Sequence, residues 1–166
     1  MTGDEKIRIL ITGGTFDKDY DEIGGKLFFQ DTHIHEMLKL GRCRVPVEVR
    51  TIMMVDSLDM TAQDRELILS NCRQAPERRI VITHGTDTMT ETGEVLAAAA
   101  LDKIIVLTGA MVPYAFGSSD GLFNLGSALS FAQSLPKGVY LAMNGRCFEA
   151  GKVRKNRGLG VFEAVT

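Results

Sequence analysis

Runs of apolar, mostly β-branched residues alternate along the chain with segments of helical periodicity, and this alternation constrains the fold more than any other feature. An apolar run of about four to eight residues that stops at glycine or polar residues is typical of a buried strand. Strands are expected over residues 7–11, 45–54, 79–83, 103–108 and 138–143. Because strands that alternate with helices pair in parallel and are covered on both faces, we predict a three-layer α/β fold. Its sheet is expected to be mostly parallel and flavodoxin- or Rossmann-like.

Four helices are expected between these strands, and three of them have candidate capping residues. The helices start after Thr32, at Thr61, at Thr88 and near Leu122. The Thr61 hydroxyl is placed to accept a backbone N–H at the start of the second helix. Thr88 and Glu91 have the spacing of a capping box, in which each side chain bonds the other residue's backbone N–H. Asp120 is expected to cap the fourth helix.

Length and charge favour one small domain with a small-molecule ligand. The chain has 166 residues, and we expect residues 1–166 to form a single α/β domain. The formal net charge is -2 and no segment is strongly basic, so nucleic acid is not expected as a partner. One short basic cluster is interpreted as a solvated face. It comprises Lys152, Arg154, Lys155 and Arg157.

The sequence predicts a cytoplasmic protein without a metal or organic cofactor. Acids precede the first apolar run and that run is short, so neither a signal peptide nor a membrane span is expected. Cys43, Cys72 and Cys147 fit no zinc spacing and are interpreted as reduced thiols. His33 and His35 lie two residues apart on an expected helix, do not share a face, and are assigned to the surface.

The loops that follow the strands are the candidate site, because ligands of open α/β sheets bind at the carboxyl ends of the strands. The first strand ends in Thr12-Gly13-Gly14-Thr15, where two glycines allow a sharp turn and leave a threonine hydroxyl free. The third ends in THGTDT, with Thr86 and Asp87 just ahead of a helix N-terminus. Such an end suits a carboxylate or a developing oxyanion.

Each loop taken alone also has a plainer interpretation. Thr15 is compatible with a tight turn in which its hydroxyl bonds the backbone. The segment 83–89 is compatible with an elaborate helix cap in which His84 is a satisfied hydrogen-bonding residue, and 55–60 with a solvated turn. A nucleotide-binding domain is disfavoured because no phosphate-binding glycine pattern is present.

Taken together, these segments resemble the N-terminal domain of the bacterial-type L-asparaginase family. The matching segments are 9–15, 56–60, 82–89, 108–111 and 120–125, in the family's order. TGGT alone is weakly specific, whereas TGGT, THGTDTM and TGAM in register are strongly specific. The length resembles a short-chain form, in which the C-terminal domain of the family is expected to be absent.

The resemblance implies hydrolysis of the side-chain amide of L-asparagine to L-aspartate and ammonia, through an acyl-enzyme on a threonine. The implied catalytic residues are Thr15, Thr86, Asp87, Lys155 and Tyr20. Thr15 corresponds to the family's loop nucleophile, although which threonine attacks first is left open. Lys155 corresponds to the family lysine, with Lys152 as the alternative, and Tyr20 corresponds to the loop tyrosine.

The same resemblance assigns substrate-binding positions. They are Ser57, Asp59, Gly85 and Ala110, the last through its carbonyl. The chain departs from the family pattern at three positions: Leu58 stands where many members have glutamine, Val112 where arginine is frequent, and Asn156 where threonine is usual.

Long family members complete the site with an acid from the C-terminal domain of another subunit, and no counterpart is found in this sequence. We expect Asp19, Asp21 or Glu22, which flank Tyr20, to take that role, or the role to be dispensed with. By resemblance, the protein is expected to be a homo-oligomer, dimer or tetramer, that acts on an amino acid and binds neither nucleic acid nor a membrane.

Two further functions stay open. A domain that kept the pocket but lost turnover would bind an amino acid as a sensor without releasing ammonia. An amidase of a larger complex, such as the relatives that supply ammonia for amidation of charged tRNA, is disfavoured because the chain has no basic extension. The choice between asparagine and glutamine is also open, since one methylene is worth only about 1–3 kcal/mol.

Overall fold

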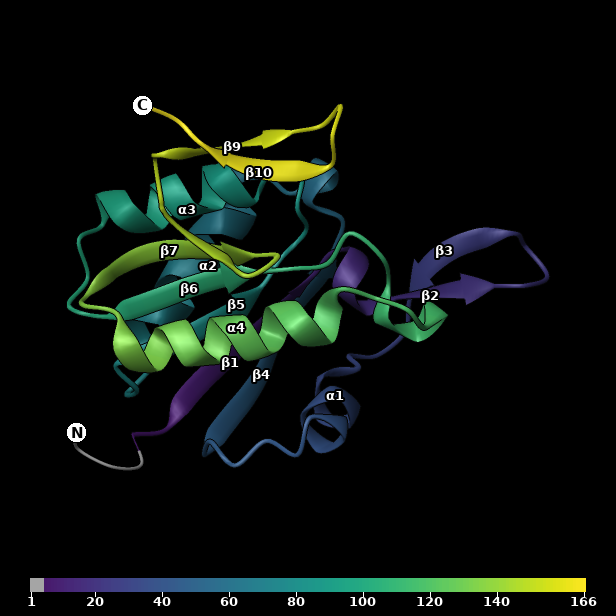
Figure 1. The fold of residues 1–166 in the computed structure, drawn as a ribbon, viewed down its shortest axis with the longest axis horizontal. Helices are drawn as coiled ribbons and strands as arrows, with labels where there is room; N and C mark the ends of the chain where they lie inside the picture. Colours follow the sequence, from purple (N-terminus) through teal and green to yellow (C-terminus); the bar gives the residue numbers. More distant parts are fainter. Residues whose placement is uncertain (1–4) are drawn as a thin grey trace.

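The computed structural model describes residues 5–166 and has a central sheet covered by helices on both faces (Figure 1). The sheet contains β1 (Ile7–Gly13), β4 (Val47–Val55), β5 (Arg79–Thr83), β6 (Ile104–Thr108), β7 (Gly138–Met143) and β8 (Arg146–Glu149). The helices are α1 (Ile34–Leu40), α2 (Ala62–Gln74), α3 (Met89–Ala98) and α4 (Gly121–Ser134). Every strand and helix predicted from the sequence is confirmed, with ends that move by a few residues.

The sheet order is β4-β1-β5-β6-β7-β8, and all neighbours pair in parallel except β7 and β8. Numbered along the chain, the parallel strands lie in the order 2-1-3-4-5, which is the doubly wound, flavodoxin-like arrangement. The chain leaves β1 toward one edge of the sheet and β5 toward the other, so a crevice is expected between the C-terminal ends of these strands. The predicted three-layer fold is confirmed, with one antiparallel edge strand added.

Alternate residues of each strand face two separate cores. Ile9 and Val106 pack on the side that α1 and α4 cover. Leu10 and Leu107 pack on the side that α2 and α3 cover. All four side chains are at most 1% exposed. Because these strands are buried on both faces, their sequences are continuous apolar runs.

The helix caps predicted from the sequence have different outcomes. At α2, Thr61 Oγ1 accepts the Asp64 N–H at 3.1 Å and the Asp64 carboxylate accepts the Thr61 N–H at 2.9 Å, which forms a complete capping box. The capping box predicted at α3 is wrong. The Thr88 hydroxyl donates to the Ser57 carbonyl at 2.9 Å, and Glu91 pairs with an arginine of α2. A tertiary contact with the loop after β4 therefore replaces the local cap.

The prediction that Asp120 caps α4 through its side chain is also wrong. Asp120 occupies the N-cap position, but its side chain forms no capping bond. Its carboxylate accepts the N–H groups of Met111 and Val112 and the side-chain amide of Asn124, each at 3.0 Å. The buried Asn124 also donates to the Gly109 carbonyl at 2.8 Å. Asp120 and Asn124 therefore fix the loop that follows β6.

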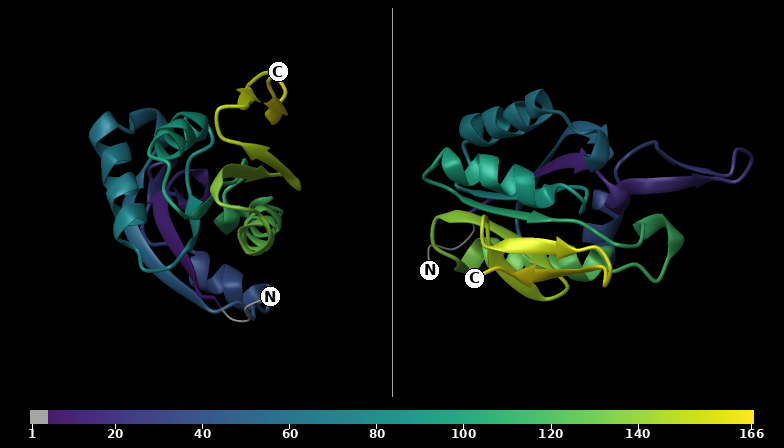
Figure 2. Two further views of the ribbon diagram at one scale, coloured as in Figure 1. Left: turned by 90° about the vertical axis from the view of Figure 1, so that its left-hand side faces the viewer. Right: turned by 90° about the horizontal axis from the view of Figure 1, so that it is seen from above.

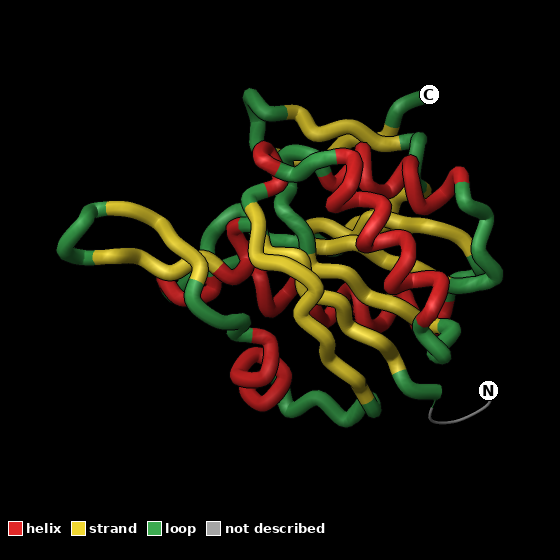
Figure 3. The backbone as a smooth tube through the Cα atoms, turned by 180° about the vertical axis from the view of Figure 1, so that it is seen from behind, coloured by secondary structure: helices red, strands yellow, loops and turns green. Residues whose placement is uncertain are grey.

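Two antiparallel hairpins, which we did not predict, form separate two-stranded sheets beside the central one. The first pairs β2 (Lys18–Asp21) with β3 (Lys26–Phe29) and projects from the body of the molecule (Figures 1 and 3). The second pairs β9 (Val153–Asn156) with β10 (Val161–Ala164) and lies over α3 (Figures 1 and 2). Strands of this length give too few alternations for a periodic signal.

The remaining sequence expectations concern membranes, thiols and metals. No helix of the described residues is long and apolar enough to cross a membrane. The three cysteines are free, and burial in the α2–α3 core raises the pKa of the Cys72 thiol to about 12. Within residues 5–166, no three His, Cys, Asp or Glu side chains gather as metal ligands.

Candidate active site

The loops that follow β1, β4 and β5 are packed against one another at the C-terminal edge of the sheet. A Cβ on Gly14 would lie 2.4 Å from Gly85 N, and a Cβ on Gly85 would lie 2.5 Å from Ser57 Oγ. Side chains at these two positions would overlap their neighbours, so glycine permits the close approach. Three segments that are distant in sequence therefore meet where the strand order places the crevice.

Thr86 and Asp87 follow β5, and Lys155 reaches them from β9 of the C-terminal hairpin. Lys155 Nζ lies 2.8 Å from Thr86 Oγ1 and 2.8 Å from Asp87 Oδ1. The Lys155 side chain is only 11% exposed, so its stem is packed and its amine is directed at the cluster. The structure thus brings together three residues that we assigned to one catalytic group.

The interpretation of the basic cluster as a solvated face is wrong for Lys155, whose side chain is 11% exposed, whereas Lys152, Arg154 and Arg157 are exposed. Lys152 and Arg154 pair with glutamates on the exposed side. Arg157 turns to Asp87 beside Lys155: its Nε lies 3.6 Å from Asp87 Oδ1, and its Nη2 donates to the Asp87 carbonyl at 3.3 Å. Arg157 lies in the turn between β9 and β10, so strand alternation with Lys155 gave no signal for this contact.

Thr15 begins a short 3₁₀ turn, Thr15–Asp17, directly after β1. The preceding Gly14 has φ 81° and ψ -179°, a conformation that is essentially restricted to glycine. The Thr15 side chain is half-buried and forms no hydrogen bond with another described residue, whereas Thr12 donates to the Thr83 carbonyl at 2.7 Å. The Thr15 hydroxyl therefore has no protein partner within the described residues.

With this geometry established, the family can be decided by comparison. The sequence model of the N-terminal asparaginase domain matches residues 6–164. The chain belongs to the asparaginase family. The L-asparaginase of Thermococcus kodakarensis is 32% identical over 167 residues, which cover 96% of this chain and 51% of the relative. L-asparaginase 1 of Escherichia coli K12 is 30% identical over 161 residues, which cover 91% of this chain and 47% of the relative.

Solved asparaginase structures show the same likeness. The thermostable L-asparaginase of Thermococcus kodakarensis has a TM-score of 0.85 at 31% identity, over 96% of this chain and 51% of that chain. L-asparaginase I of Vibrio cholerae has a TM-score of 0.87 at 27% identity, over 98% of this chain and 52% of that chain. The asparaginase-type fold is confirmed, and the chain spans about half the length of the relatives that it matches.

The substrate-binding positions implied by the asparaginase resemblance have different surroundings. Ser57 is 2% exposed, and its Oγ accepts the Thr88 N–H at 3.3 Å beneath Gly85. Ala110 is 1% exposed just after β6. Asp59 is exposed in the 3₁₀ turn Ser57–Asp59. Ser57 and Gly85 are therefore part of the packed loop cluster, whereas the Asp59 side chain is in solvent.

The structure does not bring Tyr20 to Thr86 and Lys155. Tyr20 lies on β2 and is 53% exposed, and its ring meets Phe116 edge to face with 6.2 Å between centroids. The β2–β3 hairpin that carries it extends away from the sheet (Figure 3). Within the described residues, the tyrosine hydroxyl has no hydrogen-bond partner. Its assigned role in asparaginase chemistry remains a prediction.

The acids that flank Tyr20 are engaged at the hairpin. Asp19 Oδ1 lies 3.0 Å from His33 Nε2, and the Asp21 carboxylate accepts a backbone N–H of the hairpin turn at 3.0 Å. Glu22 is exposed. His33 precedes α1 and is half-buried beside Asp19, and His35 is exposed as expected.

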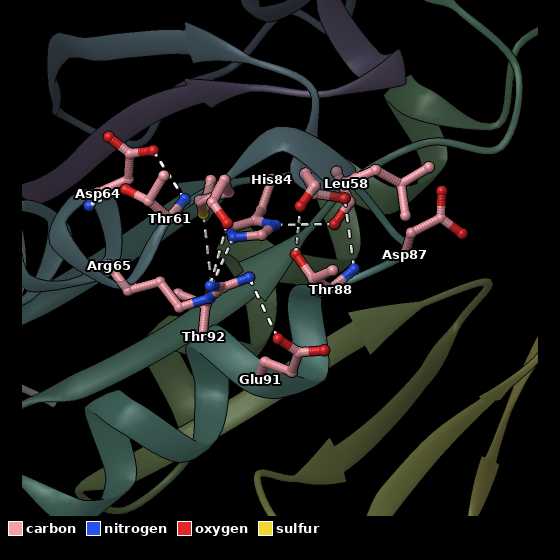
Figure 4. A network of polar contacts seen from close by, with 12 residues as sticks. Leu58, Thr61, Asp64, Arg65, His84, Asp87, Thr88, Glu91 and Thr92 are labelled. Atoms are coloured by element: carbon pink, nitrogen blue, oxygen red, sulfur yellow. Dashed lines mark hydrogen bonds and ion pairs between the residues drawn. The ribbon is translucent and has the colours of Figure 1, made fainter.

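His84 is fully buried behind the Thr86 loop and is the satisfied histidine of the plainer interpretation (Figure 4). Its Nδ1 lies 2.7 Å from the Gly85 carbonyl and its Nε2 lies 2.7 Å from Thr92 Oγ1. Burial lowers the pKa of His84 to about 4. The ring is therefore neutral at neutral pH, and it bonds the backbone of the loop that follows β5.

Proposed function

We propose that this chain hydrolyses the side-chain amide of L-asparagine to L-aspartate and ammonia, through a threonine nucleophile and an acyl-enzyme. One observation carries the proposal: in a chain of the asparaginase family, Lys155 Nζ lies 2.8 Å from the hydroxyl of Thr86. The relatives named L-asparaginase support asparagine as the substrate.

The chemistry follows from that contact. A threonine hydroxyl is a weak nucleophile until a base removes its proton, and 2.8 Å is within reach for transfer to an amine. In this proposal the Thr86 hydroxyl oxygen bonds to the amide carbon while its proton passes to the Lys155 amine, which must first release its ammonium proton to solvent. Asp87, also 2.8 Å from Nζ, opposes that release, because a nearby carboxylate favours the charged form of an amine. Collapse of the intermediate breaks the C–N bond and returns the proton to the departing ammonia, and water then cleaves the ester.

Asp87 is proposed to hold the ammonium group of the amino acid as well. Lys155 and Arg157 share its Oδ1, at 2.8 and 3.6 Å, which leaves Oδ2 for a ligand. The N-terminus of α3, just beyond Thr88, has partial positive charge and is suited to the α-carboxylate. A zwitterionic amino acid therefore fits the charges around Thr86.

An amino-acid-binding domain without turnover is the second candidate, and the hairpin favours it. Asp19 is paired with His33, and Tyr20 packs on Phe116, so neither takes part in the cluster around Thr86. Such a site would retain recognition of the ammonium and carboxylate groups but lack a second proton donor. Turnover that survives replacement of Asp19, Asp21 and Glu22 together would dispose of a local acid.

The deciding experiment is ammonia release from L-asparagine and from L-glutamine, with Thr15→Ala, Thr86→Ala and the control Thr90→Ala. Thr90 lies on α3, is half-buried, and is outside the cluster. We expect turnover on asparagine that is lost in Thr15→Ala and Thr86→Ala and kept in Thr90→Ala. Full activity of Thr86→Ala would contradict the role of Thr86. No ammonia from the parent protein, with asparagine still raising its melting temperature, would establish the binding candidate.

Assembly and location stay predictions that follow from the resemblance. A homo-oligomer is expected to elute as a dimer or tetramer, and light scattering of the eluted protein measures its mass. A cytoplasmic location is tested by cell fractionation.

A further inference from the structure

A buried chain of hydrogen bonds connects α2 to the peptide group that precedes Thr86 (Figure 4). Arg65 Nε lies 3.1 Å from Thr92 Oγ1, and Thr92 Oγ1 lies 2.7 Å from His84 Nε2. His84 Nδ1 in turn lies 2.7 Å from the Gly85 carbonyl oxygen. His84 and Thr92 are each 0% exposed, and the reaction steps above use neither of them.

Only one placement of the protons satisfies all three contacts. The Gly85 carbonyl can only accept, so His84 Nδ1 must carry a proton. In a neutral ring Nε2 is then an acceptor, and the Thr92 hydroxyl donates to it. The Arg65 guanidinium is always charged and only donates, so it gives its Nε–H to the Thr92 oxygen. Every bond therefore points one way, from Arg65 to Gly85.

A charged His84 would break this chain. Both ring nitrogens would then donate, and the Thr92 oxygen would accept from two cations. The Thr92 proton would be left with Met60 Sδ at 3.7 Å, which is a weak acceptor. Burial, together with the positive charge of Arg65, lowers the pKa of His84 to about 4, so the ring stays neutral at neutral pH.

Arg65 is itself held at its other nitrogens. Its Nη1 donates to the Met60 carbonyl at 3.3 Å, and its Nη2 lies 3.3 Å from the Glu91 carboxylate. The side chain is only 11% exposed. Since α3 and the loop before α2 both contribute partners, the guanidinium is held from two sides where the chain begins.

We propose that Arg65, Thr92 and His84 are positioning residues that fix the Gly85–Thr86 peptide for the reaction at Thr86, an inference that rests on the proposed function. In a trans peptide the carbonyl and the following N–H point in opposite directions. With the Gly85 carbonyl held by His84, the Thr86 N–H is directed away from His84. Gly85 has no side chain to restrain this peptide, so the restraint comes from the buried chain.

The proton placement is tested first, by ¹⁵N NMR of the imidazole at pH 7. The chain has three histidines, and His84→Gln identifies the signals of His84. We expect a neutral ring with its proton on Nδ1. A proton on Nε2, or a cationic ring, would overturn the inference. This measurement needs no turnover, so it is independent of the proposed function.

Positioning is then tested with Thr92→Val, which removes the hydroxyl at nearly constant shape, against Thr90→Val on the same helix. We expect kcat on asparagine to fall about tenfold to a hundredfold in Thr92→Val, since misplacement by about 1 Å costs this much. KM should change less than about twofold, Thr92→Ser should restore kcat, and Thr90→Val should match the parent. Urea midpoints of the variants separate these effects from a loss of stability.

Equal kcat values for Thr92→Val and Thr90→Val would overturn the positioning role. If the parent protein releases no ammonia, the proposed function fails, and the amide chemical shifts of Gly85 and Thr86 decide the inference instead. Shifts that move in Thr92→Val but not in Thr90→Val support it, and shifts that stay in place in both overturn it.

Discussion

Two regions carry the residues assigned to the reaction, and they differ in how firmly the folded chain holds them. Around Thr86, the amine of Lys155 and the ring of His84 each contact two partners of the same cluster. On the β2–β3 hairpin, Tyr20 is 53% exposed and has a single aromatic contact. Folding alone therefore assembles the side of the site around Thr86, whereas it leaves Tyr20 in solvent.

The base of the hairpin is buried and its tip is exposed, which explains this contrast. Asp17 is 0% exposed, and its carboxylate accepts the Thr32 hydroxyl at 3.0 Å and the His33 N–H at 2.8 Å. At the tip, Ile23 is fully exposed. A segment with few buried apolar contacts opens at low free energy, whereas one in a buried network opens only with larger parts of the fold.

The largest effect is expected on the assembled side, from Lys155→Met. The variant keeps most of the packed stem but removes the amine from Thr86 and Asp87. We expect the rate of ammonia release to fall about 10³-fold, the scale of a lost general base. Lys152→Met, on the exposed side of the same region, is the matched control and should stay near the parent rate. Activity of Lys155→Met within tenfold of the parent would refute a base at this position.

The next contrast is between one glycine of each region. A Cβ on Gly14 would lie 2.4 Å from Gly85 N, and its φ and ψ are available essentially to glycine alone. We expect Gly14→Ala to lower the free energy of unfolding by more than about 3 kcal/mol. Gly25 at the hairpin has φ 65° but no neighbour closer than 4.0 Å, so Gly25→Ala should cost about 1 kcal/mol. Urea unfolding measures both, and equal losses would show that the loops are less tightly packed than described.

The fold was largely predictable because its central strands are buried on both faces. Leu10 and Leu107 point to one core and Ile9 and Val106 to the other, so the runs stand out without any alignment. The hairpins escaped prediction because strands of four residues have little periodicity. The errors at Thr88 and Asp120 share one cause. Each residue has a local cap available, and each is instead bound to a loop from elsewhere in the chain.

The residues of the candidate site were predictable only through the resemblance to the asparaginase family. Thr86 and Asp87 are adjacent in sequence, but Lys155 is placed by the β9–β10 hairpin, which carried no structural signal. Arg157 was missed because a short basic run is usually solvated. The hydrogen-bond chain at His84 was not predictable, since it depends on tertiary packing: α3 brings Thr92 to His84, and the packing of α2 on α3 brings Arg65 to Thr92.

The pH dependence of stability gives the sharpest test of the assembled side. The pKa of His84 falls from 6.5 to about 4 on folding because the ring is buried. Above pH 6.5 the ring is neutral in both the folded and the unfolded state, so the free energy of unfolding does not depend on this residue's protonation. As the pH falls from 6.5 to 4, the unfolded chain binds a proton that the folded chain does not, so stability declines. The total is about 3 kcal/mol, and below pH 4 this residue adds nothing further.

Urea midpoints measured from pH 7 to pH 4 in the parent, His84→Gln and His35→Gln isolate this contribution. Asp17 opposes it, because burial raises its pKa and the folded state then binds the additional proton as the pH falls. The difference between the parent and His84→Gln removes that term, which both proteins share. We expect the acid decline to flatten in His84→Gln and to persist in His35→Gln, whose ring is exposed on α1. An unchanged decline in His84→Gln would mean that the buried ring accepts a proton in the folded state, and the region around Thr86 would then be as open to solvent as the hairpin.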